Sequence, residues 1–140
     1  MKKSNRIFKI LGIVQILIAL GAIPASIMFL INPDGSLMGM TTTMISQSPF
    51  PDYLIPGLFL LIIHGIGNII GAVFSFNLID AAGKTGALFG LILVLWITIQ
   101  MYWMGYISFL QPIMLGFGII EAGIGIVIIR RLRKVRGVKQ

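Results

Sequence analysis

The chain has 140 residues, of which 57% are hydrophobic and only 11% are charged, and its mean hydropathy is +1.00. A soluble domain of this size could not bury that much apolar surface, so the composition predicts an integral membrane protein. The formal net charge of +7 is divided between the two ends of the chain, which favours membrane topology and anionic lipid headgroups over a nucleic-acid partner. The chain has no Cys, and this excludes disulfide exchange and thiolate metal sites.

Four long apolar runs predict four membrane-spanning helices. The start of the first run resembles a signal peptide, but the run continues to Ile31, which is span length. The predicted fold is therefore an all-α, integral membrane four-helix bundle that uses residues 1–140 as a single domain. The expected spans cover residues 7–31, 53–79, 85–107 and 112–129, and a basic tail follows at 130–140.

The eleven Lys and Arg residues predict how the bundle is oriented. Four of them precede the first apolar run, Lys84 lies between the second and third runs, and the other six follow the fourth. The connections at residues 32–53 and 107–112 carry none. Because short loops rich in Lys and Arg stay in the cytoplasm, we expect an N-in, C-in topology with a roughly 20-residue outer loop between the first two spans. The expected location is a bacterial cytoplasmic membrane, with both termini cytoplasmic.

Polar and small residues recur at helical spacing on one face of each expected span. Because polar residues are costly in lipid, we expect these faces to meet inside the bundle. The faces comprise Gly12, Gln15, Ala19, Ala22 and Ser26 in the first span, Gly57, His64, Asn68, Gly71 and Ser75 in the second, Gly86, Gly90 and Gln100 in the third, and Gly118, Glu121 and Gly125 in the fourth. Small residues allow helix backbones to approach closely, so the expected helix-packing positions are Gly67, Gly71, Gly86, Gly90, Gly118 and Gly125.

Two residues stand out on these faces. Glu121 is the only acidic residue in a span and His64 is the only histidine of the chain, and we expect both near the bilayer centre. Ionisable residues inside a membrane are commonly functional, so the candidate ligand or proton site comprises Glu121, His64, Asn68 and Gln100. In such a site Glu121 is neutral or is paired with a donor such as His64. The alternative is a structural hydrogen-bond cluster that fixes the helix register.

The sequence offers little for catalysis or metal binding. Ser75 lies about three turns from His64, so no nucleophile and base are predicted to meet. The spacing of Met38, Met40 and Met44 suits a soft metal ion, but no His or Cys supports it within the loop, and methionine is also common at apolar interfaces. We expect no metal ion, no cofactor and no catalytic residue.

Three stretches of the chain carry a resemblance to known proteins. They are Pro33-Asp34-Gly35-Ser36, the stretch from Ser48 to Gly57, and Gln111-Pro112 through Glu121. With these stretches the chain resembles a group of short bacterial four-span membrane proteins of unassigned function, over nearly its whole length. In size and span count it is also similar to the DoxX-like proteins. The resemblance implies a fold and a compartment, and it implies no activity.

The expected function is non-catalytic binding through the intramembrane polar face. The expected ligand is a lipid-like or hydrophobic molecule such as a quinone, and the alternative is a membrane-protein partner. Membrane lipids and a second copy of the chain are further expected partners. One alternative is a small proton-coupled transporter that uses Glu121. Small multidrug transporters also have four spans and one embedded Glu, but theirs lies in the first span rather than the fourth. The other alternative is an intramembrane acid–base enzyme acting on a lipid, with His64 as base and Glu121 as its partner.

Overall fold

The computed structural model describes residues 2–138, and no strand occurs in this part of the chain. The long helices are α1 (Lys2–Ile31), α4 (Ala81–Met104) and α5 (Leu110–Val138). Between α1 and α4, three segments follow one another without a break: α2 (Leu54–Phe59), the π-helical segment η3 (Leu60–Gly67) and α3 (Asn68–Phe76). The connection after α1 contains two short 3-10 turns, η1 (Ser36–Met38) and η2 (Thr42–Ile45).

Four helical stretches are long and apolar enough to cross a membrane, which confirms the prediction of an all-helical chain with four such helices. They are Asn5–Ile31, Leu54–Phe76, Ala81–Met104 and Leu110–Val138. The bounds differ most in the last helix, for which the sequence predicts an end near residue 129. The helix instead continues through the basic residues to Val138, because Lys and Arg are good helix formers and do not stop a helix once it is under way.

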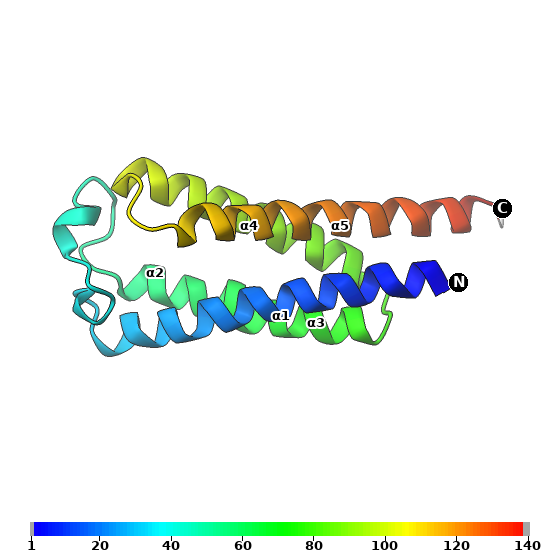
Figure 1. The fold of residues 1–140 in the computed structure, drawn as a ribbon, viewed down its shortest axis with the longest axis horizontal. Coiled ribbons are helices and arrows are strands. Elements are labelled where there is room, and N and C mark those ends of the chain that lie inside the picture. The colour runs from blue at the N-terminus through cyan, green and yellow to red at the C-terminus, as the bar shows by residue number, and fades with distance from the viewer. Residues whose placement is uncertain (1, 139–140) are drawn as a thin grey trace.

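The helices are arranged as two layers that run along the same axis (Figure 1). α4 and α5 make the most extensive contact, while α1 packs against α2, η3 and α3. α1 also contacts α5, and this contact joins the two layers. Both chain ends lie at one end of the bundle, which we call the terminal end, and the connection between α1 and α2 lies at the other, which we call the loop end.

The outer surface of the bundle is apolar. Leu20, Leu95 and Ile119, from three different helices, are 65%, 60% and 57% exposed. Six polar side chains of the described residues, in contrast, are fully buried inside the bundle: Gln15, Ser26, His64, Asn68, Ser75 and Glu121. Large apolar side chains outside and polar ones inside are the distribution that a lipid environment favours, so the fold is that of a multi-pass membrane protein.

Glycines bring the backbones of α4 and α5 into direct contact. A Cβ atom on Gly90 would overlap the backbone nitrogen of Ala122, and one on Gly125 would overlap the backbone nitrogen of Ala87. Gly118 faces Gly90 from α5, with the Gly90 carbonyl 3.2 Å from its Cβ position. Such close packing increases the van der Waals contact that holds helices together in lipid.

Two other glycines play a different part from the one that their spacing predicts. Gly67 and Gly71 are four residues apart, which predicts one shared contact with a neighbouring helix backbone. In the structure they meet side chains on two different helices: Gly67 faces Phe89 of α4, and Gly71 faces the amide of Gln15 on α1. Gly71 therefore makes room for a buried polar side chain rather than for a helix backbone.

The connection between α1 and α2 folds over the loop end. The Tyr53 hydroxyl donates a hydrogen bond to the Thr41 carbonyl at 2.8 Å, and the Tyr53 ring stacks on Phe29 with the ring centres 4.9 Å apart. Ile45 is buried against the same two rings. Gly35 has φ +83, which a residue with a side chain rarely adopts, and this allows the tight turn after α1. These contacts hold the connection across the ends of the helices.

Candidate functional site

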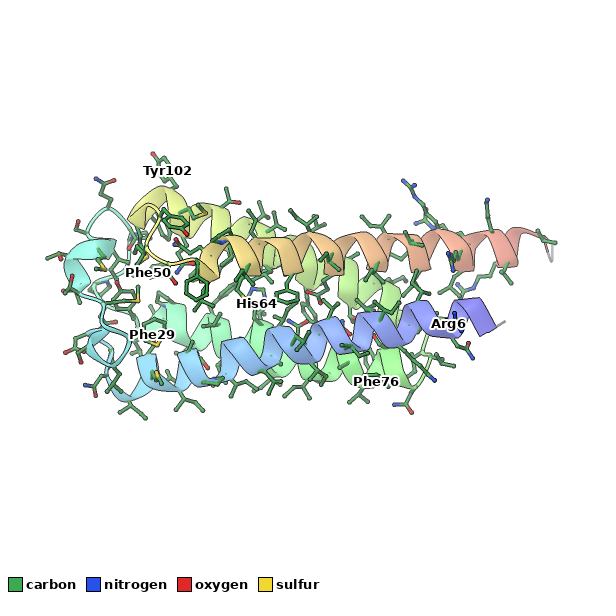
Figure 2. All side chains as sticks on the ribbon, in the orientation of Figure 1. Arg6, Phe29, Phe50, His64, Phe76 and Tyr102 are labelled. Carbon is green, nitrogen blue, oxygen red and sulfur yellow. The ribbon has the colours of Figure 1, made fainter. Side chains whose placement is uncertain are left out.

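A seam of polar side chains runs through the interior of the bundle. Its members come from α1, η3, α3 and α5, and each is 0% exposed: Gln15, His64, Asn68, Ser75 and Glu121. Figure 2 shows His64 near the middle of the bundle, away from both ends. Buried polar groups need hydrogen-bond partners to offset the loss of water, so the partners of these five residues decide what the seam can do.

Gln15 connects three helices through its side-chain amide. Its Nε2 donates to Glu121 Oε1 at 3.4 Å, and its Oε1 accepts a hydrogen bond from Ser75 Oγ at 2.8 Å. Ser75 Oγ also lies 3.0 Å from the Gly71 carbonyl. The bond to Glu121 is near the long limit for a hydrogen bond, whereas the bond to Ser75 has an ordinary length. Glu121 is therefore linked to α1 by one weak contact.

His64 and Asn68 lie at the transition from the π-helical segment to α3. Asn68 Nδ2 donates to the His64 carbonyl at 3.1 Å. Both ring nitrogens of His64 and the Oδ1 atom of Asn68 are buried without a hydrogen-bond partner among the described residues. The Phe59 ring and the imidazole pack in a T-shaped arrangement, with ring centres 5.6 Å apart. π-helical turns are frequent at functional sites.

The structure does not bring the four predicted site residues together. No nitrogen of His64 lies within 4.0 Å of a Glu121 oxygen, and no Cα atom of α5 lies within 8 Å of one in η3. His64 is therefore not the donor to Glu121 in the structure, and Gln15 provides the hydrogen bond instead. Gln100 is also separate, because it lines a cavity nearer the loop end.

That cavity has a volume of about 360 Å³ and opens among α1, α2, α4, the start of α5 and the folded connection. Most of its wall is aromatic, aliphatic or methionine side chains, among them Phe29, Met38, Trp96, Trp103 and Met114. No charged residue and no histidine lines it. Volumes of 300 to 1,000 Å³ with mostly apolar walls are typical of small-molecule sites.

The polar groups of the cavity wall are mostly engaged within the protein. Gln111 accepts a hydrogen bond from the Ile107 backbone nitrogen at 2.9 Å and donates to the Gly105 carbonyl at 3.3 Å. Ser108 accepts one from Leu110. For the partly buried Gln100, no hydrogen bond to another described residue is found, so its amide is available to a molecule in the cavity.

An aromatic contact connects the cavity to the polar seam. Trp96 lines the cavity, and its ring lies 4.6 Å from the Phe59 ring, measured between centres. Phe59 in turn packs on His64. These two rings separate the cavity from the imidazole, so the cavity and the seam are neighbouring but distinct features of the bundle.

The chemistry available in the described residues is limited. No group of three or more His, Cys, Asp or Glu residues is placed to hold a metal ion between residues 2 and 138. The only hydroxyl in the seam beside Glu121 and Gln15 is that of Ser75, and it donates to Gln15 rather than to a base.

Sequence reasoning missed the importance of Gln15 and of the cavity. Gln15 was recognisable as the one amide on the polar face of the first span, because a buried amide needs partners as an acid does. The cavity had a weaker signal, the concentration of Trp and Tyr in the outer half of the third span. Such residues are equally expected in an interfacial aromatic belt.

Comparison with protein-family models, with curated proteins and with solved structures found no match to this chain.

Proposed function

We propose that this protein binds a neutral, hydrophobic small molecule in the cavity at the loop end of the bundle. The observation that carries the proposal is a cavity of about 360 Å³ whose wall contains no Asp, Glu, Lys, Arg or His. A charged ligand in such a site would lose its hydration without gaining a partner, which is strongly unfavourable. An apolar molecule gains from the same environment, because its surface is removed from water.

Gln100 is the group that orients the ligand. An amide offers both a donor and an acceptor, so it can recognise a carbonyl or a hydroxyl on an otherwise apolar body. Lipid-like molecules with one such group, including quinones, belong to this class. Trp96 and Trp103 provide flat apolar surfaces beside it, which suits a ring system.

Transport coupled to Glu121 has less support. A proton-coupled transporter of the small multidrug type needs its acidic residue where the substrate binds, and Glu121 does not line the cavity. An acid–base enzyme that joins His64 to Glu121 has less support for the same geometric reason, since the two residues do not meet. Binding without chemistry is the function that the arrangement favours.

Ligand retention tests the proposal. Ala25 lines the cavity, so Ala25→Phe is expected to fill part of it and to reduce the bound ligand at least about tenfold, which corresponds to ~1.4 kcal/mol of lost affinity. The protein would be extracted in native-lipid discs, and mass spectrometry would quantify the neutral molecules retained per protein chain. Gln100→Leu is expected to weaken retention of the same molecule.

Leu95→Phe is the matched control, because it adds a ring to α4 at a position that is 60% exposed and outside the cavity. It should retain the ligand as the unchanged protein does. Equal retention by Ala25→Phe would contradict the cavity proposal. A stoichiometric protein partner retained by all forms, with no small molecule, would favour the accessory-subunit alternative.

We further propose that the bundle lies in a bacterial cytoplasmic membrane with the terminal end in the cytoplasm. The start of α4, which contains Lys84, and the part of α5 from Arg130 to Arg136 lie at or beyond this end, and the connection that folds over the loop end carries no Lys or Arg. The positive-inside rule favours this orientation. The same orientation places the cavity opening towards the outer leaflet.

The absence of cysteine makes the orientation simple to test. Thr42→Cys introduces a thiol in the connection at the loop end, and Gly137→Cys introduces one at the terminal end; both positions are exposed. We expect a membrane-impermeant maleimide to label Thr42→Cys in intact cells, and to label Gly137→Cys only after the membrane is permeabilised. The reverse pattern would contradict the proposed orientation.

A further inference from the structure

We propose that Glu121 is a reversible proton-binding site inside the bundle, separate from the ligand cavity. The ligand is the proton itself, taken from and returned to the aqueous phase. The proposal does not depend on the cavity or on its ligand, because Glu121 is not part of the cavity wall. It stands on the burial of the carboxyl group, on its few hydrogen-bond partners and on the distance of the described cations from it.

Burial and partners are the first step of the argument. Glu121 is 0% exposed, and its Oε2 atom has no hydrogen-bond partner among the described residues. Its Oε1 atom accepts only the long bond from Gln15. An ionised carboxylate in this environment would be nearly unsolvated, and an isolated buried charge of this kind is avoided by neutralisation. The group that fits is the protonated carboxylic acid.

The surrounding elements provide no positive charge to pair with Glu121. α5 packs on α1 and α4, and the only ion pair among the described residues joins Arg136 to Asp80 at the terminal end. On α1 the nearest cation along the chain from Gln15 is the exposed Lys9, six residues or about 9 Å along the helix. On α4 the only cation is the exposed Lys84.

The cations of α5 and the side chain of His64 are also far from Glu121. Arg130 is nine residues beyond Glu121, or about 13 Å along the helix. His64 belongs to η3, which does not pack on α5. No charged group therefore replaces the proton as the partner of this carboxyl group.

Gln15 makes the site reversible rather than permanently neutral. When the acid O–H bond breaks, the proton passes to a water molecule or a hydroxide ion from the aqueous phase and the electron pair stays on the carboxylate. The Gln15 N–H is then already directed at Oε1, and a hydrogen bond to an ionised oxygen is stronger and shorter than one to a neutral oxygen. Gln15 also accepts a hydrogen bond from Ser75. Ionisation of Glu121 on α5 is therefore linked through Gln15 to α1 and through Ser75 to α3.

A single labelled carbon tests the proposal, because Glu121 is the only glutamate of the chain. Cell-free synthesis with [δ-13C]glutamate and unlabelled glutamine would mark this carboxyl group alone. Solid-state NMR of the protein in lipid bilayers would then follow the resonance across a pH series. We expect the carboxylic-acid resonance at neutral pH, conversion to the carboxylate resonance under alkaline conditions, and return of the acid resonance when the pH is lowered again.

Two results would overturn the proposal. A carboxylate resonance at neutral pH would mean that Glu121 is ionised and held by a cation, and a response to sodium would identify that cation. An acid resonance that does not change up to the pH at which the bundle unfolds would make Glu121 a permanent structural hydrogen-bonding group. Neither result would affect the ligand-retention experiment, so the two proposals fail separately.

Aspartate provides the matched control. The Ser36 backbone N–H donates to Asp34 Oδ1 at 2.9 Å and holds the pKa of this exposed carboxyl group below its ordinary value. In a sample labelled with [γ-13C]aspartate, the Asp34 resonance is therefore expected to be that of the carboxylate at neutral pH. The comparison shows whether the instrument distinguishes the two forms under the same bilayer conditions.

Discussion

Replacing Gly90 by Ala is expected to lower the free energy of unfolding by about 2 kcal/mol. Overpacking a tight contact costs roughly 1 to 3 kcal/mol, and here the added methyl group meets the backbone nitrogen of Ala122 and the carbonyl oxygen of Gly118. A backbone cannot rotate away as a flexible side chain can. The clash therefore outweighs the gain of about 1 kcal/mol that Ala brings to a helix over Gly.

The measurement is the unfolding of the purified protein in mixed micelles with increasing denaturing detergent, followed by circular dichroism. Gly125→Ala should behave in the same way, because its methyl group would meet the backbone of Ala87 and Gly83. The two positions act on one interface, so we expect the double variant to lose less stability than the sum of the single variants.

Gly123→Ala is the control for helix propensity. It lies on the same helix as Gly125, but no atom lies within 4 Å of its Cβ position. We expect it to leave the protein as stable as before, or more stable by up to about 1 kcal/mol. Equal destabilisation by Gly90→Ala and Gly123→Ala would show that α4 and α5 do not touch through their backbones.

Replacing Gln15 by Leu is expected to destabilise the bundle by about 2 kcal/mol, within the range of roughly 1 to 3 kcal/mol for leaving a buried polar group unsatisfied. The substitution keeps the side-chain volume nearly unchanged. It removes the hydrogen bond to Glu121 and leaves that carboxyl group with no partner among the described residues. Ser75 loses its bond to Gln15 but keeps its contact with the Gly71 carbonyl.

A double variant separates the free-energy cost of leaving Glu121 unsatisfied from the free energy contributed by the hydrogen bond between Gln15 and Glu121. Replacing both partners by apolar residues removes the unsatisfied groups, and such replacements are commonly neutral or stabilising. We therefore expect Gln15→Leu with Glu121→Leu to be more stable than Gln15→Leu alone, in the same unfolding assay. Additive losses from the two substitutions would indicate that Gln15 and Glu121 do not interact.

The polar faces illustrate what helical periodicity can and cannot predict. Gln15, Asn68 and Glu121 were each expected on an inward face, and each is fully buried. The partner of Glu121 is not predictable from the sequence. Helical periodicity gives the direction in which a side chain points around its own helix, but it does not say which neighbouring helix lies in that direction. The sequence suggests a donor such as His64, and only the position of α1 between α5 and α3 places Gln15 there instead.

The π-helical segment and the cavity depend on the tertiary structure in the same way. Leu60–Gly67 has no Pro and no local signal that distinguishes it from an ordinary α-helix. From the sequence, Gln100 is grouped with Glu121, His64 and Asn68 in one candidate site, because Gln100 shares the polar face of the third span with Gly86 and Gly90. In the structure Gln100 faces the cavity, where α4 is separated from α1 and α2 by the space that the connection covers.

The sequence by itself determined that the chain forms four long apolar helices. Each apolar run is long enough to cross a membrane, and a backbone in lipid must satisfy its polar groups within a helix. It also determined which side of each helix avoids lipid. Only the tertiary structure decided which polar groups meet. Distances between side chains on different helices depend on helix order and closest approach, and here the backbone contacts at Gly90 and Gly125 set the approach of α4 and α5.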